Sequence, residues 1–243
     1  MPQRELATFA YIEEPPFAWT QENGFPAGCD VELVFKILNR IGLRQINTRK
    51  VTFPDLIPGV VNGDWLINTP MFITPERSKS VEFTKPVWVL SDGFMVRENS
   101  QDIDSYESLS QALDLRVGTV RSQVQHDRAI NAGVASERIQ IFEKQEDAVS
   151  ALQKNEIDVY IATSMGHRAF IKQHNAISLT VIDVEQDGAT AFGGYSFARS
   201  QSDLVKDFNA ALAEYIRSSD YRTAMISYGF TDSDVSLVVA QYD

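Results

Sequence analysis

The positions of apolar side chains along this chain predict two runs of alternating strands and helices. In the first run, strands at residues 6–11, 45–51 and 65–68 alternate with helices at 30–41 and 52–61. The helix at 30–41 is the clearest because its apolar side chains recur at the helical period: Val31, Val34, Phe35, Leu38 and Ile41. This order predicts a mostly parallel sheet covered by helices, with a binding edge at the carboxyl ends of its strands.

The second run repeats this order without any visible sequence repeat. Its expected elements are strands at 115–120, 138–142 and 158–163 and helices at 122–132 and 146–154. The elements expected after it are a helix at 164–174, a strand at 178–184, a β-type segment at 190–199 and helices at 202–216 and 221–228.

A second β-type segment, at 88–96, separates the two runs. If the chain crosses along this segment and returns along 190–199, residues 1–90 plus 196–243 form lobe 1 and residues 91–195 form lobe 2. The sequence therefore predicts an α/β protein whose two lobes are joined by a two-stranded hinge. Such a hinge permits the lobes to close over a ligand.

The stretch at 73–88, ITPERSKSVEFTKPVW, holds the strongest candidate chemistry. Thr74 followed by proline and glutamate is typical of a helix start, which places Arg77 in the first turn. A guanidinium beside helix-terminal N–H groups can clamp a carboxylate. The alternative is an ordinary ion pair with Glu76 or Glu82, and this stretch alone leaves both interpretations open.

Composition excludes several classes of protein. The 243 residues include 22 Lys and Arg against 33 Asp and Glu, which gives a net charge of −11 without any long basic run. Nucleic acids and anionic membrane surfaces bind clustered positive charge, so neither is an expected partner. No window approaches the about 18 to 20 apolar residues of a spanning helix. The first residues, MPQRELATFAY, lack the apolar core of a signal peptide, so the chain is either cytosolic or a mature chain with an added Met1.

The sequence gives little sign of metal, cofactor or enzyme chemistry. His126, His167 and His174 show no metal-binding spacing, and there is no GxSxG, P-loop or dinucleotide motif. His167 and His174 lie seven residues apart on one predicted helix face, where a solvated or otherwise satisfied pair is favoured over a metal site. Cys29 is the single cysteine, and we expect it to be buried. We therefore predict a binding protein without cofactors and not an enzyme.

Four stretches of the first run carry a resemblance to a known family: EPPFAW, GCDVELVFKILNRIG, FPDLIPGVVNGDWLI and FITPERSKSVEFTKPVW. Weaker matches follow in the expected order: RVGTVRSQ, NEIDVYIATS, GGYSFAR and SDLVKDFNAALAEYI. Over nearly its full length the chain resembles the family 3 extracellular solute-binding proteins, the polar amino-acid receptors of ABC importers. The resemblance implies two lobes of the periplasmic binding protein type, a ligand held between them, a periplasmic setting with the signal peptide trimmed, and a membrane permease as partner.

The resemblance also implies ligand contacts at particular positions. Arg77 falls where the family's arginine holds the α-carboxylate of the ligand. Phe17 and Phe53 fall where members have aromatic walls, although both phenylalanines could instead be ordinary core residues. The remaining expected contacts lie at strand ends and in strand-to-helix turns: Tyr11, Asn68, Thr69, Pro70, Phe72, Arg121, Ser122, Gln123 and Thr163. For the turn at 121–123, the alternative is an ordinary helix cap.

Three departures from the family pattern affect the expected ligand. Phe72 replaces a usual threonine or serine, and Ser122 and Gln123 replace a usual Gly-Thr pair. Thr163 stands where the family's aspartate receives the ammonium group, and an unpaired buried ammonium costs several kcal/mol. Glu14, in the first-lobe loop, is the nearest alternative acid, unless it is simply solvated. The sequence thus predicts a carboxylate ligand whose ammonium is absent, displaced or recognised differently.

Taken together, the residues and the resemblance predict a monomeric solute-binding protein that captures a small carboxylate-bearing ligand and delivers it to an ABC importer. Two alternatives use the same scaffold. One is the ligand-sensing domain of a signalling receptor, and the other is an enzyme similar to the cyclohexadienyl dehydratases.

Overall fold

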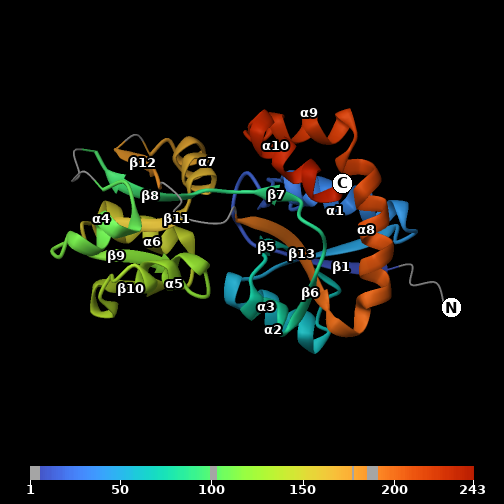
Figure 1. The fold of residues 1–243 in the computed structure, drawn as a ribbon, viewed down its shortest axis with the longest axis horizontal. Coiled ribbons are helices and arrows are strands. Elements are labelled where there is room, and N and C mark those ends of the chain that lie inside the picture. Colours follow the sequence, from blue (N-terminus) through green and yellow to red (C-terminus); the bar gives the residue numbers. More distant parts are fainter. Residues whose placement is uncertain (1–5, 99–102, 177, 185–190) are drawn as a thin grey trace. The chain divides into compact units, whose positions relative to one another are not determined.

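Two units, each built on its own sheet, make up the chain (Figure 1). The computed structural model describes residues 6–98, 103–176, 178–184 and 191–243. The first unit comprises Met1–Val89 and Ala191–Asp243, and the second comprises Leu90–Thr190. Each unit is described below by itself.

The sheet of the first unit combines a parallel and an antiparallel part. Its strands lie in the order β4-β1-β5-β13-β6, and β7 also pairs with β13. These strands are β1 (Leu6–Tyr11), β4 (Gln45–Lys50), β5 (Ile67–Phe72), β6 (Val81–Phe83), β7 (Trp88–Val89) and β13 (Phe192–Ala198). β1 runs parallel to β4 and β5, whereas β13 is antiparallel to β5, β6 and β7.

Helices pack around this sheet; in Figure 1, α9 and α10 lie above it and α2 and α3 below it. The helices are α1 (Cys29–Arg40), α2 (Leu56–Asn62), α3 (Pro75–Ser78), α8 (Ser202–Ile216), α9 (Ser219–Ser227) and α10 (Asp232–Val239). Short 3-10 turns lie at Phe53–Asp55, Arg199–Gln201 and Ala240–Tyr242, and a small hairpin joins β2 (Trp19–Thr20) to β3 (Pro26–Ala27). Edge-to-face contacts of Phe208 with Tyr195 and Phe197 fix α8 on β13.

The second unit has the strand order β10-β9-β11-β8-β12. Its strands are β8 (Asp92–Arg97), β9 (Val117–Val120), β10 (Ile139–Phe142), β11 (Val159–Thr163) and β12 (Leu179–Asp183). Its helices are α4 (Tyr106–Gln111), α5 (Val124–Asn131), α6 (Gln145–Gln153) and α7 (Ser164–His174), with a 3-10 turn at Ser136–Arg138. β9 is parallel to β10 and β11, and β8 is antiparallel to β11 and β12.

The predicted α/β class with two similar units is confirmed. The two predicted runs are present as β1-α1-β4-α2-β5 and β9-α5-β10-α6-β11. In both units the first strand of the run lies between the second and the third, as β4-β1-β5 and β10-β9-β11. The two halves therefore share their local topology without a visible sequence repeat.

Several predicted boundaries were wrong. The third strand is β5, at Ile67–Phe72 and not at 65–68, so residues 69–72 belong to a buried strand. The segment 88–96 is two strands, of which β7 pairs in the first unit and β8 in the second. β13 pairs wholly within the first unit, so residues 191–195 belong there and not to lobe 2. Residue 190 of the predicted hinge range lies outside the described residues, and the hinge itself stays a prediction.

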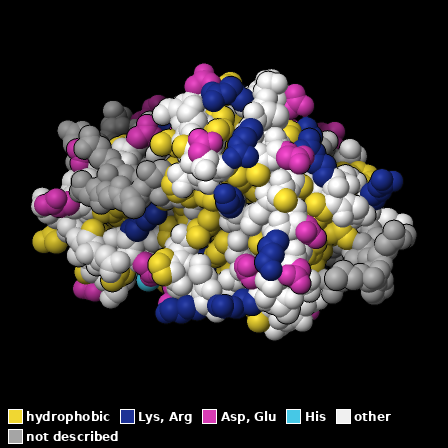
Figure 2. All heavy atoms as spheres, turned by 45° about the vertical axis from the view of Figure 1, so that its right-hand side comes forward, with side chains coloured by type: hydrophobic (Ala, Val, Ile, Leu, Met, Phe, Trp, Pro, Cys, Tyr) yellow, Lys and Arg dark blue, Asp and Glu magenta, His cyan; other side chains and the backbone are white. Residues whose placement is uncertain are grey.

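Two properties of the surface and helices bear on the possible partners. On the face drawn in Figure 2, basic and acidic side chains are interspersed. Among the described residues, no helix combines the length and apolar character needed to cross a membrane.

Candidate ligand-binding site

Three segments of the first unit start at one edge of its sheet. β4, β1 and β5 are adjacent and parallel, so their carboxyl ends meet at the same edge. Phe53 follows β4, Glu14 follows β1, and Arg77 follows β5. This is the edge at which α/β folds bind ligands. The topology thus brings an aromatic ring, an acid and an arginine together from three different parts of the sequence.

Arg77 is held in place by its own segment. The Nη1 atom of Arg77 donates a hydrogen bond of 2.9 Å to the carbonyl oxygen of Phe72, and the guanidinium lies 5.4 Å from the ring centroid of Phe53. Glu76, the alternative partner considered from sequence, forms an ion pair with Lys79. The half-buried Arg77 therefore has an aromatic ring and a backbone carbonyl to orient it.

The backbone around Arg77 differs from expectation. α3 is a single turn, and its N-cap Thr74 accepts a hydrogen bond from the backbone N–H of Arg77 through its hydroxyl at 3.2 Å. The expectation of unpaired N–H groups around Arg77 is therefore wrong for its own amide, because Thr74 occupies it. The side chain of Arg77, and not its amide, is the group that suits an anion.

The expected aromatic residues divide into two sets. Phe17 and Phe72 are buried, and their rings pack on Trp88 with centroid separations of 6.0 and 5.4 Å. Phe53 is half-buried and faces Arg77. Tyr11 is buried at the end of β1, and its hydroxyl hydrogen-bonds to Thr20 Oγ1 at 2.9 Å. Phe53 is thus the expected aromatic wall that the structure brings to Arg77.

The polar residues of β5 serve the interior of the first unit. Asn68 is fully buried, and its Nδ2 atom donates to the Leu56 carbonyl at 2.7 Å and to Ser196 Oγ at 3.0 Å, while its Oδ1 accepts from Trp65. Thr69 donates its hydroxyl hydrogen bond to a buried carboxylate, and Pro70 is buried. The structure therefore places the side chains of Asn68, Thr69 and Pro70 in the core, because each polar group already has an internal partner.

Asp30 is a buried carboxylate at the predicted start of the helix at 30–41. The N-cap of α1 is instead Gly28, at φ 127°, so Asp30 lies inside the first turn. Its Oδ2 accepts from Thr69 Oγ1 at 3.1 Å and its Oδ1 from Trp88 Nε1 at 3.2 Å. Burial raises the pKa of Asp30 from 3.8 to about 7, against the opposing effect of these hydrogen bonds. Asp30 thus joins α1, β5 and β7 from within.

Glu14 lies in a turn that its own backbone organises. Its N–H donates to the Ala18 carbonyl at 2.8 Å, and its carbonyl accepts from the N–H groups of Phe17 and Ala18 at 3.0 and 3.1 Å. The side chain is half-buried. Burial raises the pKa of Glu14 from 4.5 to about 7, and the nearby Asp30 carboxylate raises it further. Glu14 is therefore not the solvated loop acid that was its alternative.

In the second unit, the turn between β9 and α5 carries three expected contacts. Arg121 forms an exposed ion pair with Glu143 at 2.7 Å. Ser122 adopts a left-handed backbone conformation with φ 66°. Gln123 is the N-cap of α5, and within the described part of the chain its buried Oε1 has no hydrogen-bond partner. The guanidinium of Arg121 is thus engaged with an acid, while the side chain of Gln123 retains an unused acceptor.

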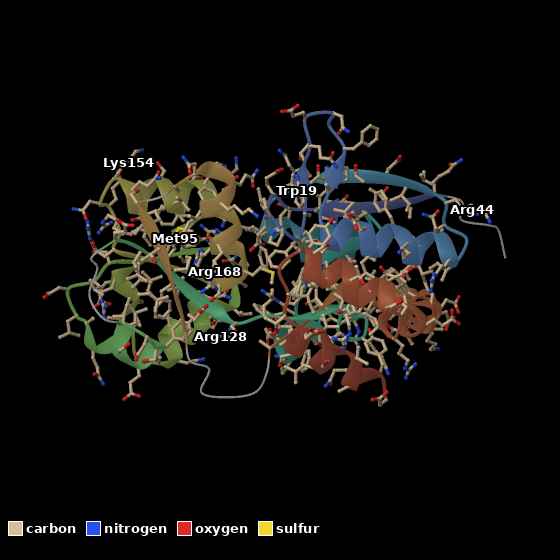
Figure 3. The ribbon with its side chains drawn as sticks, turned by 90° about the horizontal axis from the view of Figure 1, so that it is seen from above. Trp19, Arg44, Met95, Arg128, Lys154 and Arg168 are labelled. Atoms are coloured by element: carbon tan, nitrogen blue, oxygen red, sulfur yellow. The ribbon has the colours of Figure 1, made fainter. Side chains whose placement is uncertain are left out.

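Thr163 and Asp92 anchor the helices of the second unit. Thr163 is the N-cap of α7, and its hydroxyl accepts from the Gly166 N–H at 3.2 Å, so it supplies no negative charge for an ammonium group. Asp92, missed from sequence, is buried and accepts hydrogen bonds from Gln125 Nε2 and the Tyr106 hydroxyl, each at 2.8 Å. It also forms an ion pair with Arg128 of α5, which Figure 3 labels.

The histidines form no metal site in the described residues, where no cluster of three or more His, Cys, Asp or Glu side chains is present. His167 is fully buried and hydrogen-bonds through Nε2 to the Gly93 carbonyl at 3.1 Å, whereas His174 is exposed. A solvated pair is therefore wrong for His167, which is a core histidine with Nε2 hydrogen-bonded and with a buried Nδ1 that has no hydrogen-bond partner among the described residues. Cys29 is buried as expected.

Comparison with known proteins decides the family. The sequence profile described as "Bacterial extracellular solute-binding proteins, family 3" matches residues 8–230. The chain belongs to this family. The resemblance seen in its motifs is thereby confirmed, and this solute-binding protein can be set beside its relatives.

Among curated relatives, a probable amino-acid ABC transporter periplasmic-binding protein of Sinorhizobium fredii is 26% identical, over 97% of this chain and 80% of the relative. The L-arginine-binding protein of Pseudomonas aeruginosa is 24% identical, over 88% and 83%.

Among solved structures, EhuB in complex with hydroxyectoine has a TM-score of 0.89 at 21% identity, over 98% of this chain and 92% of that one. A histidine kinase sensor domain with similarity to periplasmic binding proteins has a TM-score of 0.82 at 18% identity, over 92% and 96%. At such identities these structures support the fold of this solute-binding protein and nothing finer.

Proposed function

We propose that this solute-binding protein captures a small carboxylate-bearing ligand, an amino acid or a related compound, and delivers it to an ABC importer. The observation that carries the proposal is the setting of Arg77 at the carboxyl edge of the sheet, oriented by Phe53 and the Phe72 carbonyl. The names of the relatives support the same ligand class, since they include amino-acid-binding and L-arginine-binding proteins.

Arginine suits a carboxylate better than lysine does. Its planar guanidinium presents donors in a fork that matches the two carboxylate oxygens. Stacking on Phe53 and the hydrogen bond to Phe72 restrict the rotamers of Arg77 before a ligand arrives. Less conformational entropy is then lost on binding, so the pre-oriented side chain binds more tightly than a mobile one.

The proposal includes a periplasmic location, a monomeric state and a permease as the membrane partner. It requires no cofactor, because capture and release involve no chemical step. In cells that lack this gene, uptake of the bound solute should fall and should return with the wild-type gene. Binding without any effect on uptake would favour a sensor, a role carried by the histidine kinase sensor domain of similar fold.

Calorimetric titration tests the ligand class. L-Arginine, L-histidine, L-glutamate and hydroxyectoine are the probes, since each is named for a relative or a structural neighbour. At least one should bind the wild type and stabilise it thermally. Arg77→Ala should weaken that binding by about 2 to 5 kcal/mol, as expected when one half of a desolvated charge pair is removed.

Arg49→Ala is the matched control, because Arg49 also stacks on an aromatic ring of the first unit, 5.3 Å from Trp65. It should bind as the wild type does. Binding by Arg77→Ala within tenfold of wild type would refute the role of Arg77. Failure of all four probes would count against the ligand class, and turnover of prephenate or arogenate would show an enzyme instead.

A further inference from the structure

Two Asn-Gly pairs occur in the chain, and they lie in different settings. Asn23 and Gly24 form part of the turn between β2 and β3, whereas Asn62 and Gly63 lie at the carboxyl end of α2. In such a pair the backbone nitrogen of glycine can attack the asparagine side chain, because no Cβ hinders the approach. A difference in reactivity between the two pairs therefore comes from the structure around them.

The two pairs are alike in exposure and backbone conformation. All four residues are exposed. Gly24 and Gly63 both adopt left-handed conformations, with φ 81° and 79°. The N–H of Gly24 donates to the Gln21 carbonyl at 2.9 Å, and the N–H of Gly63 donates to the Val60 carbonyl at 3.2 Å. These features give neither asparagine an advantage.

A hydrogen bond to the side chain of Asn23 is the first difference. The N–H of Phe25 donates to Oδ1 of Asn23 at 2.9 Å. This bond polarises the amide carbonyl, and it stabilises negative charge on Oδ1 when a nucleophile adds to Cγ. Within the described residues, no hydrogen bond reaches the side chain of Asn62. The amide of Asn23 is therefore the better electrophile.

The cost of opening the backbone is the second difference. The turn that carries Asn23 joins strands of only two residues, Trp19–Thr20 and Pro26–Ala27, and Pro26 has no N–H to donate to the partner strand. Figure 3 shows the hairpin that carries Trp19 projecting from the first unit. Since few contacts hold this turn, the N–H of Gly24 leaves its carbonyl partner at a low free-energy cost.

The end of α2 is held more firmly. The N–H of Asp64 donates to the Gly59 carbonyl at 2.8 Å across the end of the helix. Val60 and Trp65, on either side of the second pair, belong to one buried cluster. Freeing the N–H of Gly63 disturbs this cluster, so opening costs more free energy here than in the hairpin.

We propose that Asn23 is a site of spontaneous covalent modification and that α2 protects Asn62. The nitrogen of Gly24 gives its proton to hydroxide or a buffer base and bonds to Cγ of Asn23. The bond between Cγ and Nδ2 breaks, and ammonia leaves with a proton from water. Water then opens the succinimide ring at either of its two carbonyl carbons, which leaves aspartate or isoaspartate. The reaction adds one negative charge beside Glu22 to a chain whose net charge is −11.

Incubation of the full chain at pH 7 and pH 8.5, folded and in urea, tests the proposal. Trypsin releases Asn23 in the peptide 5–36 and Asn62 in the peptide 51–77, so mass spectrometry follows both asparagines in one sample. Fragment ions locate the mass increase, and isoaspartyl methyltransferase labels the isoaspartate product.

In the folded protein, Asn23 should convert at least about tenfold faster than Asn62, and in urea the two rates should agree within about threefold. The rate at Asn23 should rise with pH, because the nitrogen of Gly24 must lose a proton. Equal rates at the two asparagines in the folded protein would overturn the proposal. So would an Asn23 that stays intact in the folded protein and converts in urea.

Two variants test the chemical step. Gly24→Ala should slow the conversion of Asn23 at least about tenfold, because a Cβ shields the attacking nitrogen. Gly63→Ala is the matched control, and it should leave the rate at Asn23 unchanged. Conversion of Asn23 in Gly24→Ala at the wild-type rate would show direct hydrolysis of the amide and overturn the cyclisation. Should Gly24→Ala fail to fold, the ratio of the two rates in the wild type decides alone.

Discussion

The buried His167 leads to a stability prediction whose size follows from the structure. The ring is fully buried in the second unit, its Nε2 hydrogen-bonds to the Gly93 carbonyl, and its edge meets the Tyr160 ring at a centroid separation of 4.8 Å. Burial lowers the pKa of His167 from 6.5 to about 3. The unfolded chain therefore binds a proton at pH values where the folded chain does not.

The direction of the pH dependence of stability follows from this difference in proton binding between the folded and unfolded chain. The stability that neutral His167 provides is complete above pH 6.5 and is lost as the pH falls from 6.5 to about 3. With about 1.4 kcal/mol for each pH unit, the loss amounts to about 2 kcal/mol at pH 5 and about 3 kcal/mol at pH 4.

Urea unfolding at pH 7.5 and pH 5 of wild type and His167→Gln measures this loss. Glutamine keeps a donor for the Gly93 carbonyl but cannot titrate. The variant should have a lower unfolding free energy than wild type at pH 7.5, and this difference in unfolding free energy should be about 2 kcal/mol smaller at pH 5. Glu14 and Asp30 titrate in both proteins, so they cancel in the difference. His174→Gln is the matched control on the same helix, since His174 is exposed. A difference in unfolding free energy between wild type and His167→Gln that is the same at both pH values would refute the reasoning.

Two further predictions concern the second unit. Asp92→Asn should destabilise the protein by about 3 kcal/mol and also weaken ligand binding, because the Asp92–Arg128 ion pair fixes α5. The control Asp158→Asn breaks the ion pairs to Arg97 and Arg116, and it should lower the unfolding free energy in urea without weakening binding in titrations. Equal loss of affinity in both variants would contradict this prediction. Ser122→Gly should raise the unfolding free energy by about 1 kcal/mol, because glycine tolerates the φ of 66° that serine adopts at a penalty; a lower melting temperature would count against it.

The fold could be predicted from sequence wherever one face of an element is apolar. α1 shows this, because its buried positions recur at the helical period. β5 was predicted too early in the chain, at 65–68, because Thr69 and Pro70 do not continue an apolar strand pattern. The structure accommodates Pro70 where the register between β5 and β13 shifts, and it satisfies Asn68 with Ser196, 128 residues away. Partners so distant leave no local signal.

The candidate site likewise contains residues that local sequence predicts and residues whose role depends on distant partners. Arg77 could be predicted because the turn that carries it is encoded in four consecutive residues, and the structure retains Thr74 as the cap. Asp30 and Asp92 were missed as buried acids because they depend on distant partners: Thr69 and Trp88 lie 39 and 58 residues from Asp30, and Tyr106, Gln125 and Arg128 lie 14, 33 and 36 residues from Asp92. A lone aspartate in a sequence does not show whether tertiary contacts will bury it.

The central claim is that Arg77 holds a ligand carboxylate, and a thermodynamic cycle tests it most directly. Two ligands are each titrated into wild type and Arg77→Ala. The first is the tightest binder among L-arginine, L-histidine, L-glutamate and hydroxyectoine, and the second is the primary carboxamide of that binder. The account predicts that wild type prefers the carboxylate by at least about thirtyfold and that Arg77→Ala loses nearly all of this preference. An Arg77→Ala protein that keeps the wild-type preference for the carboxylate would contradict the account.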